Sequence, residues 1–265
     1  MDILKRSLAN ITDKAWDEID LQASKVIKAN LSARKFMDVK GPLGLDYAAV
    51  SLGKLSVPEA QKESEVNYGI RQVLPLVETR MFFELDTWEL DDVERGSENP
   101  DLSALEKAAA QIARFEEGVI YNGLEGSGIC GLSSAAQDNV VNGTANNLMD
   151  ALSKAILKFG EDSVEGPYTL IAGKSLWQMI QSSGEGYPLK KRVESLMDGG
   201  IILSPAVDCN YIVSTRGGDM EIIVGQDYSI GYCSSTVDKV KLFVTESFTF
   251  RVINPEAVIK LTLGN

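Results

Sequence analysis

Histidine is absent from the sequence. Without an imidazole, the chain cannot use Ser-His-Asp or Cys-His catalysis, His-ligated zinc or a histidine pH switch. Carboxylate, lysine, tyrosine and cysteine chemistries remain open.

Cysteine is scarce and long apolar runs are missing. The three cysteines, Cys130, Cys209 and Cys233, are far apart and form no CxxC pair. This pattern favours reduced thiols over a disulfide framework. No apolar run approaches the ~20 residues of a membrane span, and no apolar segment of a signal peptide follows the N-terminal Met1–Arg6. We therefore expect a cytoplasmic protein with no membrane partner.

Positive charge is also in deficit. Twenty-six basic residues face 38 acidic ones, a net charge of −12. Such a surface does not attract phosphate backbones, so nucleic acid is not an expected partner. The 265 residues, 44% of them hydrophobic, suffice for one large domain or two small ones with a real core.

Hydrophobic periodicity predicts an α+β fold. Helical spacing predicts helices over 12–31, 101–123, 145–159, 174–183 and 188–197. Alternation predicts strands over 80–90, 168–172, 201–203, 211–215, 220–224 and 239–253. Residues 45–80 are interrupted by Gly53, Pro58 and Pro75, which predicts an extended excursion with two arms.

Three patterns could carry chemistry, and each has a simpler interpretation. Residues 126–131 match GxGxxG, but they follow a helix end instead of a strand, so we interpret them as a loop. The acidic run from Glu84 to Glu94 could hold paired carboxylates; a solvated face or an intersubunit row is the better interpretation. Cys130 has no histidine to activate it. No catalytic or metal site is predicted.

Trp88 stands among acidic residues. On a strand over 80–90 it would share a pleat face with Arg80. A tryptophan there serves the core or an interface, or it forms a stacking platform for a planar ligand whose phosphate Arg80 could meet.

Short segments along the whole chain resemble the encapsulins, the linocin-type shell proteins of bacterial and archaeal nanocompartments. Each segment alone is weak, but together and in order they are specific. They include Arg34-Lys35-Phe36, Trp88-Glu89-Leu90-Asp91, Glu165-Gly166-Pro167-Tyr168, Gly186-Tyr187-Pro188-Leu189, Gly225-Gln226-Asp227 and Asn254-Pro255-Glu256-Ala257.

The resemblance implies the Hong Kong 97 phage capsid fold. By analogy, residues 1–40 form an N-terminal helix and arm on the lumen side, and 49–78 form the extended loop. Residues 41–48 and 79–129 form the peripheral domain with its spine helix, 130–220 approximate the axial domain, and 221–265 return to the peripheral domain. The first helix begins by residue 12, which leaves no room for the N-terminal scaffolding segment of a phage protein.

The resemblance implies a structural subunit and no enzyme. It implies self-assembly into the smallest icosahedral shell, about 60 subunits (T=1), around a cargo enzyme such as a ferritin-like protein or a dye-decolourising peroxidase. The cargo would link the shell to iron storage or oxidative stress. No cofactor is required, and a flavin is one planar ligand that Arg80 and Trp88 could contact. The alternative is a flavin-binding shell, or a flavin-dependent or hydrolytic enzyme that acts alone.

The resemblance also assigns two sites. A fivefold pore for small solutes would be formed by Gly184, Glu185, Gly186 and Tyr187. A groove between the N-terminal helix and the peripheral domain would bind a C-terminal targeting peptide of the cargo. The matching residues are Ile27, Leu31, Arg34, Asp38, Asp227, Tyr228, Ser229 and Ile230. An alternative for Arg34 and Asp38 is a simple local salt bridge.

Overall fold

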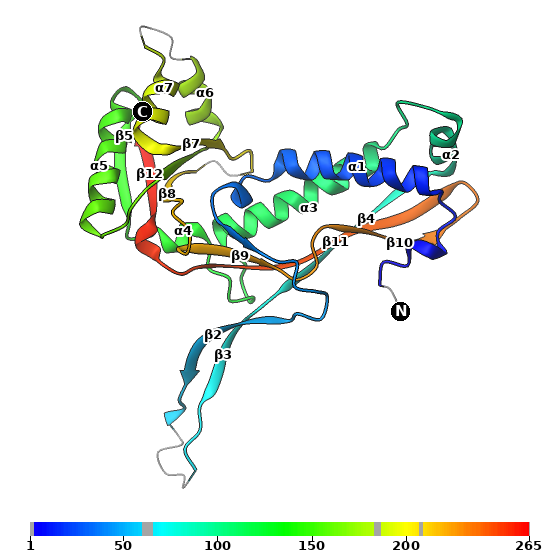
Figure 1. Cartoon of the computed structure of the whole chain (residues 1–265), viewed down its shortest axis with the longest axis horizontal. Coiled ribbons are helices and arrows are strands. Elements are labelled where there is room, and N and C mark those ends of the chain that lie inside the picture. The colour runs from blue at the N-terminus through cyan, green and yellow to red at the C-terminus, as the bar shows by residue number, and fades with distance from the viewer. Residues whose placement is uncertain (1–2, 60–65, 183–186, 207–208, 265) are drawn as a thin grey trace.

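The chain forms two five-stranded sheets, each with its own helices, and a two-stranded hairpin that projects from them (Figure 1). The computed structural model describes residues 3–59, 66–182, 187–206 and 209–264. The N-terminus lies beside the first sheet and the C-terminus beside the second (Figure 1).

The first sheet is organised around one long strand, β11. Its strand order is β1-β9-β11-β10, and β4 pairs with the other edge of β11. All pairs are antiparallel except β1 with β9. The strands are β1 (Asp38–Lys40), β4 (Val77–Asp86), β9 (Met220–Val224), β10 (Ser229–Ser235) and β11 (Lys239–Val252).

Two amphipathic helices lie side by side over this sheet (Figure 1). They are α1 (Asp13–Asn30) and α3 (Ser103–Asn122). The hydroxyl of Thr12 accepts a hydrogen bond from the N–H of Ala15 and begins α1. Ile19 of α1, Leu105 of α3 and Leu242 of β11 are fully buried in one shared core, so apolar burial fixes both helices to the sheet.

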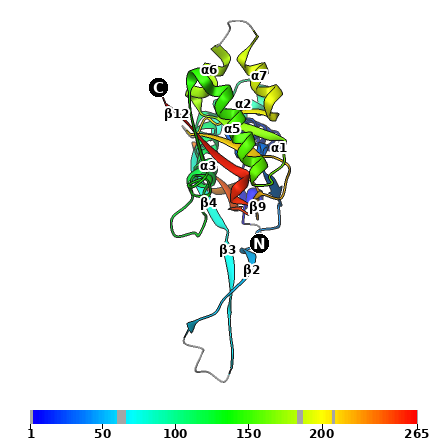
Figure 2. The ribbon, with the colours of Figure 1, turned by 90° about the vertical axis from the view of Figure 1, so that its left-hand side faces the viewer.

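The second sheet has the order β5-β12-β8-β6-β7 and carries the helices α5, α6 and α7. Figure 2 views the molecule from this end and shows these helices beside the sheet. The strands are β5 (Val140–Thr144), β6 (Tyr168–Ala172), β7 (Asp198–Leu203), β8 (Asn210–Ser214) and β12 (Val258–Gly264). The helices on this sheet are α5 (Leu148–Glu161), α6 (Lys174–Ser182) and α7 (Leu189–Met197). The short helix α4 (Leu132–Ala135) contacts α3.

The projecting hairpin consists of β2 (Ala49–Ser56) and β3 (Ile70–Pro75). They pair only with each other among the described strands, and both views show the hairpin extending away from the sheets (Figures 1 and 2). The predicted excursion over 45–80 with two arms corresponds to this hairpin. Large apolar side chains along it are exposed, including Leu55, Ile70 and Val73 at 53–61%.

The prediction of a strand over 80–90 is wrong at its C-terminal half. The strand β4 ends at Asp86, whose carboxylate accepts a hydrogen bond from the N–H of Trp88 and begins the helix α2 (Thr87–Arg95). Asp86 is a favourable N-cap, and Gly96 with its positive φ ends the helix. The acidic run therefore belongs partly to a strand and partly to a helix.

The structure also divides the C-terminal segment 221–265 between the two sheets. The strands β9, β10 and β11 lie in the first sheet as expected, but β12 lies between β5 and β8 in the second. Residues 258–264 therefore do not return to the first sheet. Both faces of β12 are buried: Val258 packs in one core cluster, and Ile259 and Leu261 pack in another.

Candidate functional site

A groove of about 700 Å³ lies between α1 and the strand β10. It is formed by four segments that are far apart in the sequence. They are the N-terminal segment with Leu4 and Arg6, one stripe of α1, the short 3₁₀ turn Ala33–Lys35 with the preceding Leu31, and residues 227–230 with Val244 behind them.

All of the predicted peptide-binding residues except Asp38 line this groove. Ile27 and Leu31 come from α1 and its C-cap, and Ile230 comes from β10. These three side chains are largely buried and belong to the same core cluster. They therefore form an apolar floor that is continuous with the core of the first sheet.

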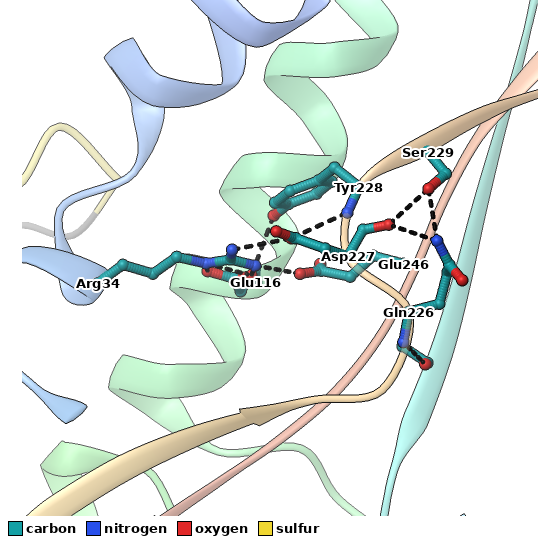
Figure 3. A network of polar contacts seen from close by, with 8 residues as sticks. Arg34, Glu116, Gln226, Asp227, Tyr228, Ser229 and Glu246 are labelled. Atoms are coloured by element: carbon teal, nitrogen blue, oxygen red, sulfur yellow. Dashed lines mark hydrogen bonds and ion pairs between the residues drawn. The ribbon is translucent and has the colours of Figure 1, made fainter. Parts of the chain in front are cut away.

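Arg34 occupies one end of the groove and joins three carboxyl groups (Figure 3). Its Nε donates a hydrogen bond to Glu116 Oε1 over 3.0 Å, and its Nη1 donates to Asp227 Oδ1 over 2.9 Å. Its Nη2 contacts both Glu116 and Glu246. The side chains of Glu116 and Glu246 are fully buried, whereas that of Asp227 is 49% exposed. One guanidinium thus links α3, β11 and the loop before β10.

The buried part of this cluster disfavours a second negative charge. Burial raises the pKa of Glu246, and the negative charge of Glu116 raises it further. Glu246 Oε2 is buried and has no hydrogen-bond partner among the described residues. Although burial alone would lower it, the contacts with Glu116 and Glu246 raise the pKa of Arg34. The cluster therefore favours a charged Arg34 and the protonated form of Glu246 over that of an ordinary glutamate.

Tyr228 and the turn around it complete this end of the groove. Burial, with the charges of Glu246 and Glu116, raises the pKa of Tyr228, and its hydroxyl donates to Glu116 Oε2 over 3.1 Å. The guanidinium of Arg34 lies over its ring, 5.0 Å from the centroid. Ser229 Oγ donates to the carbonyl of Asp227 and accepts from Gln226 Nε2 (Figure 3). These contacts hold residues 226–229 in one conformation.

A second buried carboxylate fixes the turn that carries Arg34. Glu117 Oε1 accepts hydrogen bonds from the N–H groups of Ser32 and Ala33, each over 2.8 Å. The hydroxyl of Tyr121 lies 2.9 Å from Ser32 Oγ. Burial raises the pKa of Glu117, while these donors oppose the shift. The prediction from sequence missed Glu116, Glu117, Tyr121 and Glu246, which hold Arg34 in place.

Asp38 lies outside the groove. It is on β1, where Asp38 Oδ2 accepts a hydrogen bond from the N–H of Gly218 over 2.7 Å. The local salt bridge between Arg34 and Asp38 is also not formed, because Arg34 is engaged by Glu116, Asp227 and Glu246. The prediction of a local salt bridge is therefore wrong, whereas a role of Asp38 in peptide binding stays a prediction. In the structure the residue serves the contact between β1 and the turn at 216–219.

The remaining predicted residues lie elsewhere. Gly184, Glu185 and Gly186 fall outside the described residues, and Tyr187, just before α7, is 67% exposed. The pore stays a prediction.

The prediction that Arg80 and Trp88 share one pleat face is wrong. Arg80 is on β4, where it lies over the ring of Phe243 and pairs with Glu78. Trp88 is on α2 and 66% exposed, and Arg95 lies over its ring. The flavin contact stays a prediction.

Two classes of site are not found in the described part of the chain. No group of three or more Cys, Asp or Glu residues there is arranged to hold a metal ion. No helix there is both long and apolar enough to cross a bilayer.

Comparison with solved structures defines the class of protein. The fold is similar to a virus-like particle from Pyrococcus furiosus, with a TM-score of 0.66 and 18% identity, covering 93% of this chain and 98% of that one. It is also similar to the capsid of Myoviridae phage XM1, with a TM-score of 0.57 and 14% identity over 88% and 92% of the two chains. The fold is therefore the Hong Kong 97 capsid fold, as predicted.

Sequence comparison identifies the family within that class. Residues 1–249 match the family described as "encapsulating protein for peroxidase". A type 1 encapsulin shell protein of Rhodococcus erythropolis is 37% identical over 261 residues, which cover 97% of this chain and 98% of the relative. The chain belongs to the encapsulin family of shell proteins. It is a structural protein of a capsid-like compartment and not an enzyme.

Proposed function

We propose that this subunit closes into a shell around a cargo enzyme, and that the groove between α1 and β10 binds the cargo's C-terminal peptide. One observation carries the proposal: the groove combines a deep apolar floor with charged groups at both ends. An extended peptide would place apolar side chains on Ile27, Leu31 and Ile230 and polar groups near Arg34 and Asp227.

The remaining parts of the proposed function are inferred from membership of the encapsulin family. The description of the matching family names a peroxidase, which supports a peroxidase as cargo; a ferritin-like protein is the second candidate. The cargo would supply the chemistry, in oxidative-stress defence or iron storage. In a shell of about 60 subunits, each subunit would present its groove to the lumen. Small solutes would pass through pores that include Glu185.

A blocked groove tests the docking site. Ser24 lines the groove from α1, and its neighbour Lys25 is exposed and does not. A Ser24→Trp shell should assemble normally but retain little co-expressed cargo, because the indole fills the groove. The matched Lys25→Trp shell should load cargo like wild type. Electron microscopy measures assembly, and the ratio of cargo to shell protein measures loading. Normal loading of the Ser24→Trp shell would show that the peptide binds elsewhere.

A further inference from the structure

The groove has the length of a short peptide strand. Its α1 wall runs from Asp20 to Leu31, which is about 16 Å of helix at ~1.5 Å per residue. An extended chain advances ~3.3 Å per residue, so about five residues fit along this wall.

The opposite wall is the outer edge of a sheet, and the N-terminal segment covers this edge at one end. β10 is the last strand in its sheet order, and its inner edge pairs with β11. The N–H of Tyr232 points away from β11 and donates to the carbonyl of Leu4 over 2.7 Å. Because backbone groups alternate along a strand, the N–H and C=O of Ile230 point to the same edge. Leu4 already occupies the edge at Tyr232, so a further strand would pair with β10 at Ile230.

Free positive charge is found at one end of the groove. At the Leu4 end, Arg6 is paired with Asp20 over 2.8 Å. At the Arg34 end, Lys28 and Lys35 are exposed. Neither ammonium group has an ion-pair partner within the ranges that the structure describes.

The carboxyl groups at that end are already engaged by Arg34. Glu116, Asp227 and Glu246 all pair with its guanidinium, and the side chains of Glu116 and Glu246 are fully buried. The two lysines are exposed and have no such partner among the described residues. A negatively charged group would therefore be attracted to the lysine end and not to the end with Asp20.

The charges at the two ends of the groove favour one direction for a peptide bound along β10. β10 runs from the Arg34 end towards the Leu4 end, since Asp227 contacts Arg34 and Tyr232 contacts Leu4. A strand added antiparallel to β10 runs the opposite way and ends beside Lys28 and Lys35. A parallel strand would end near the carboxylate of Asp20.

We propose that the groove recognises the free C-terminus of its partner chain: the last residues add to β10 as an antiparallel strand, and their α-carboxylate binds Lys28 and Lys35. This inference rests on the proposed docking function and deepens it. It explains why a targeting peptide would need to end the cargo chain. A carboxylate held by an ammonium group makes a charge-assisted hydrogen bond, among the stronger polar contacts in proteins.

A tail library tests the inference without knowledge of the cargo. A monomeric fluorescent reporter is co-expressed with the shell, carrying random tails of about eight residues, enough to span the groove. In one library the random tail ends the chain, and in the other a flexible glycine-serine extension follows it. Tails trapped in purified shells are sequenced. We expect terminal tails to be enriched about ten-fold over extended ones, the effect of one charge-assisted hydrogen bond.

Two shell variants assign the effect to the lysines. The double variant Lys28→Gln, Lys35→Gln should retain the trapped tails but lose the preference for the terminal library. The control Lys25→Gln removes an exposed lysine of the same helix that does not line the groove, and it should keep the preference. A preference that survives in the double variant would overturn the role of these lysines.

The outcomes separate this inference from the docking function. If both libraries are enriched equally and Ser24→Trp abolishes the enrichment, the groove binds peptides but does not recognise a C-terminus. If neither library is enriched, the docking function and the inference both fail.

Discussion

The guanidinium of Arg34 contacts the carboxyl group of Glu246 across 212 positions of sequence. The carboxyl side chain is fully buried, and the guanidinium is 16% exposed. The same guanidinium binds Glu116 on α3. The end of the groove is therefore built on an ion cluster that reaches the core between α3 and β11.

Removing Arg34 should be strongly destabilising. Arg34→Ala would leave Glu116 and Glu246 buried without a cation, and breaking such a pair costs about 3–5 kcal/mol. We expect a large drop in the unfolding temperature and a low yield of shells. The control is Arg95→Ala, which removes an exposed arginine paired with Asp91 and Asp92 and should cost no more than ~1 kcal/mol. Equal effects of the two variants, measured by thermal unfolding at one protein concentration, would contradict the cluster's role.

The same cluster predicts a pH dependence with a definite sign. The pKa of Glu246 is raised in the folded protein, whereas that of an unfolded glutamate is about 4.3. Between these values the folded state holds a proton that the unfolded chain has released. The contribution to the free energy of unfolding is therefore full below about pH 4 and falls as the pH rises towards the folded pKa.

The variant Glu246→Gln tests this sign. Glutamine is neutral at every pH, so the variant should lose less stability than wild type as the pH rises above about 4.3. Glu117, whose pKa burial also raises, is present in both proteins and cancels in the difference. Glu84→Gln, which removes an exposed carboxylate of β4, is the control and should follow wild type. A constant difference between Glu246→Gln and wild type at all pH values would contradict the raised pKa of Glu246.

Much of the fold was predictable because buried apolar residues recur with the period of a helix or of a strand. The helices α1, α3, α6 and α7 begin and end within two residues of the predicted bounds. The strand prediction failed over 87–90, where alternating acidic residues resemble a strand but Asp86 caps a helix. No strand was predicted over 258–264, where β12 lies between β5 and β8, because buried residues on both of its faces leave no alternation.

The groove was predictable only in part. Its residues were assigned from the family resemblance, and the structure brings all but Asp38 to one groove. Asp38 lies outside the groove because β1 begins at that residue and its carboxylate binds the N–H of Gly218. Glu116 and Glu246 could have been found from the sequence, because each is an acidic residue at an apolar position of its element. Glu116 follows Ile112 by four residues in its helix, and Glu246 follows Val244 by two residues in its strand. A charge at such a position predicts a buried partner.

The projecting hairpin gives a prediction about assembly. Ile70 and Val73 are exposed apolar residues on β3, and large obligate interfaces bury such surface. Ile70→Asp with Val73→Asp should prevent shell formation, which size-exclusion chromatography and electron microscopy would show. The matched change at polar positions of the same hairpin, Lys54→Asp with Gln72→Asp, should leave shells intact. Shells formed equally well by both variants would mean that this apolar surface makes no intersubunit contact.

The glycine-rich segment 126–131 has a structural role that a single methyl group can test. A Cβ at Gly131 would lie 2.3 Å from the backbone nitrogen of Gly123 and 2.6 Å from the carbonyl carbon of Asn122. These are backbone atoms at the end of α3, so no flexible side chain can move aside. Gly131→Ala should therefore cost about 1–3 kcal/mol, the usual range for overpacking, seen as a lower unfolding temperature. Gly160→Ala in α5, where an added Cβ meets no atom within 4 Å, should be neutral or stabilising by up to ~1 kcal/mol. If Gly131→Ala unfolds at the wild-type temperature, the close approach of the segment to the end of α3 does not restrain the fold.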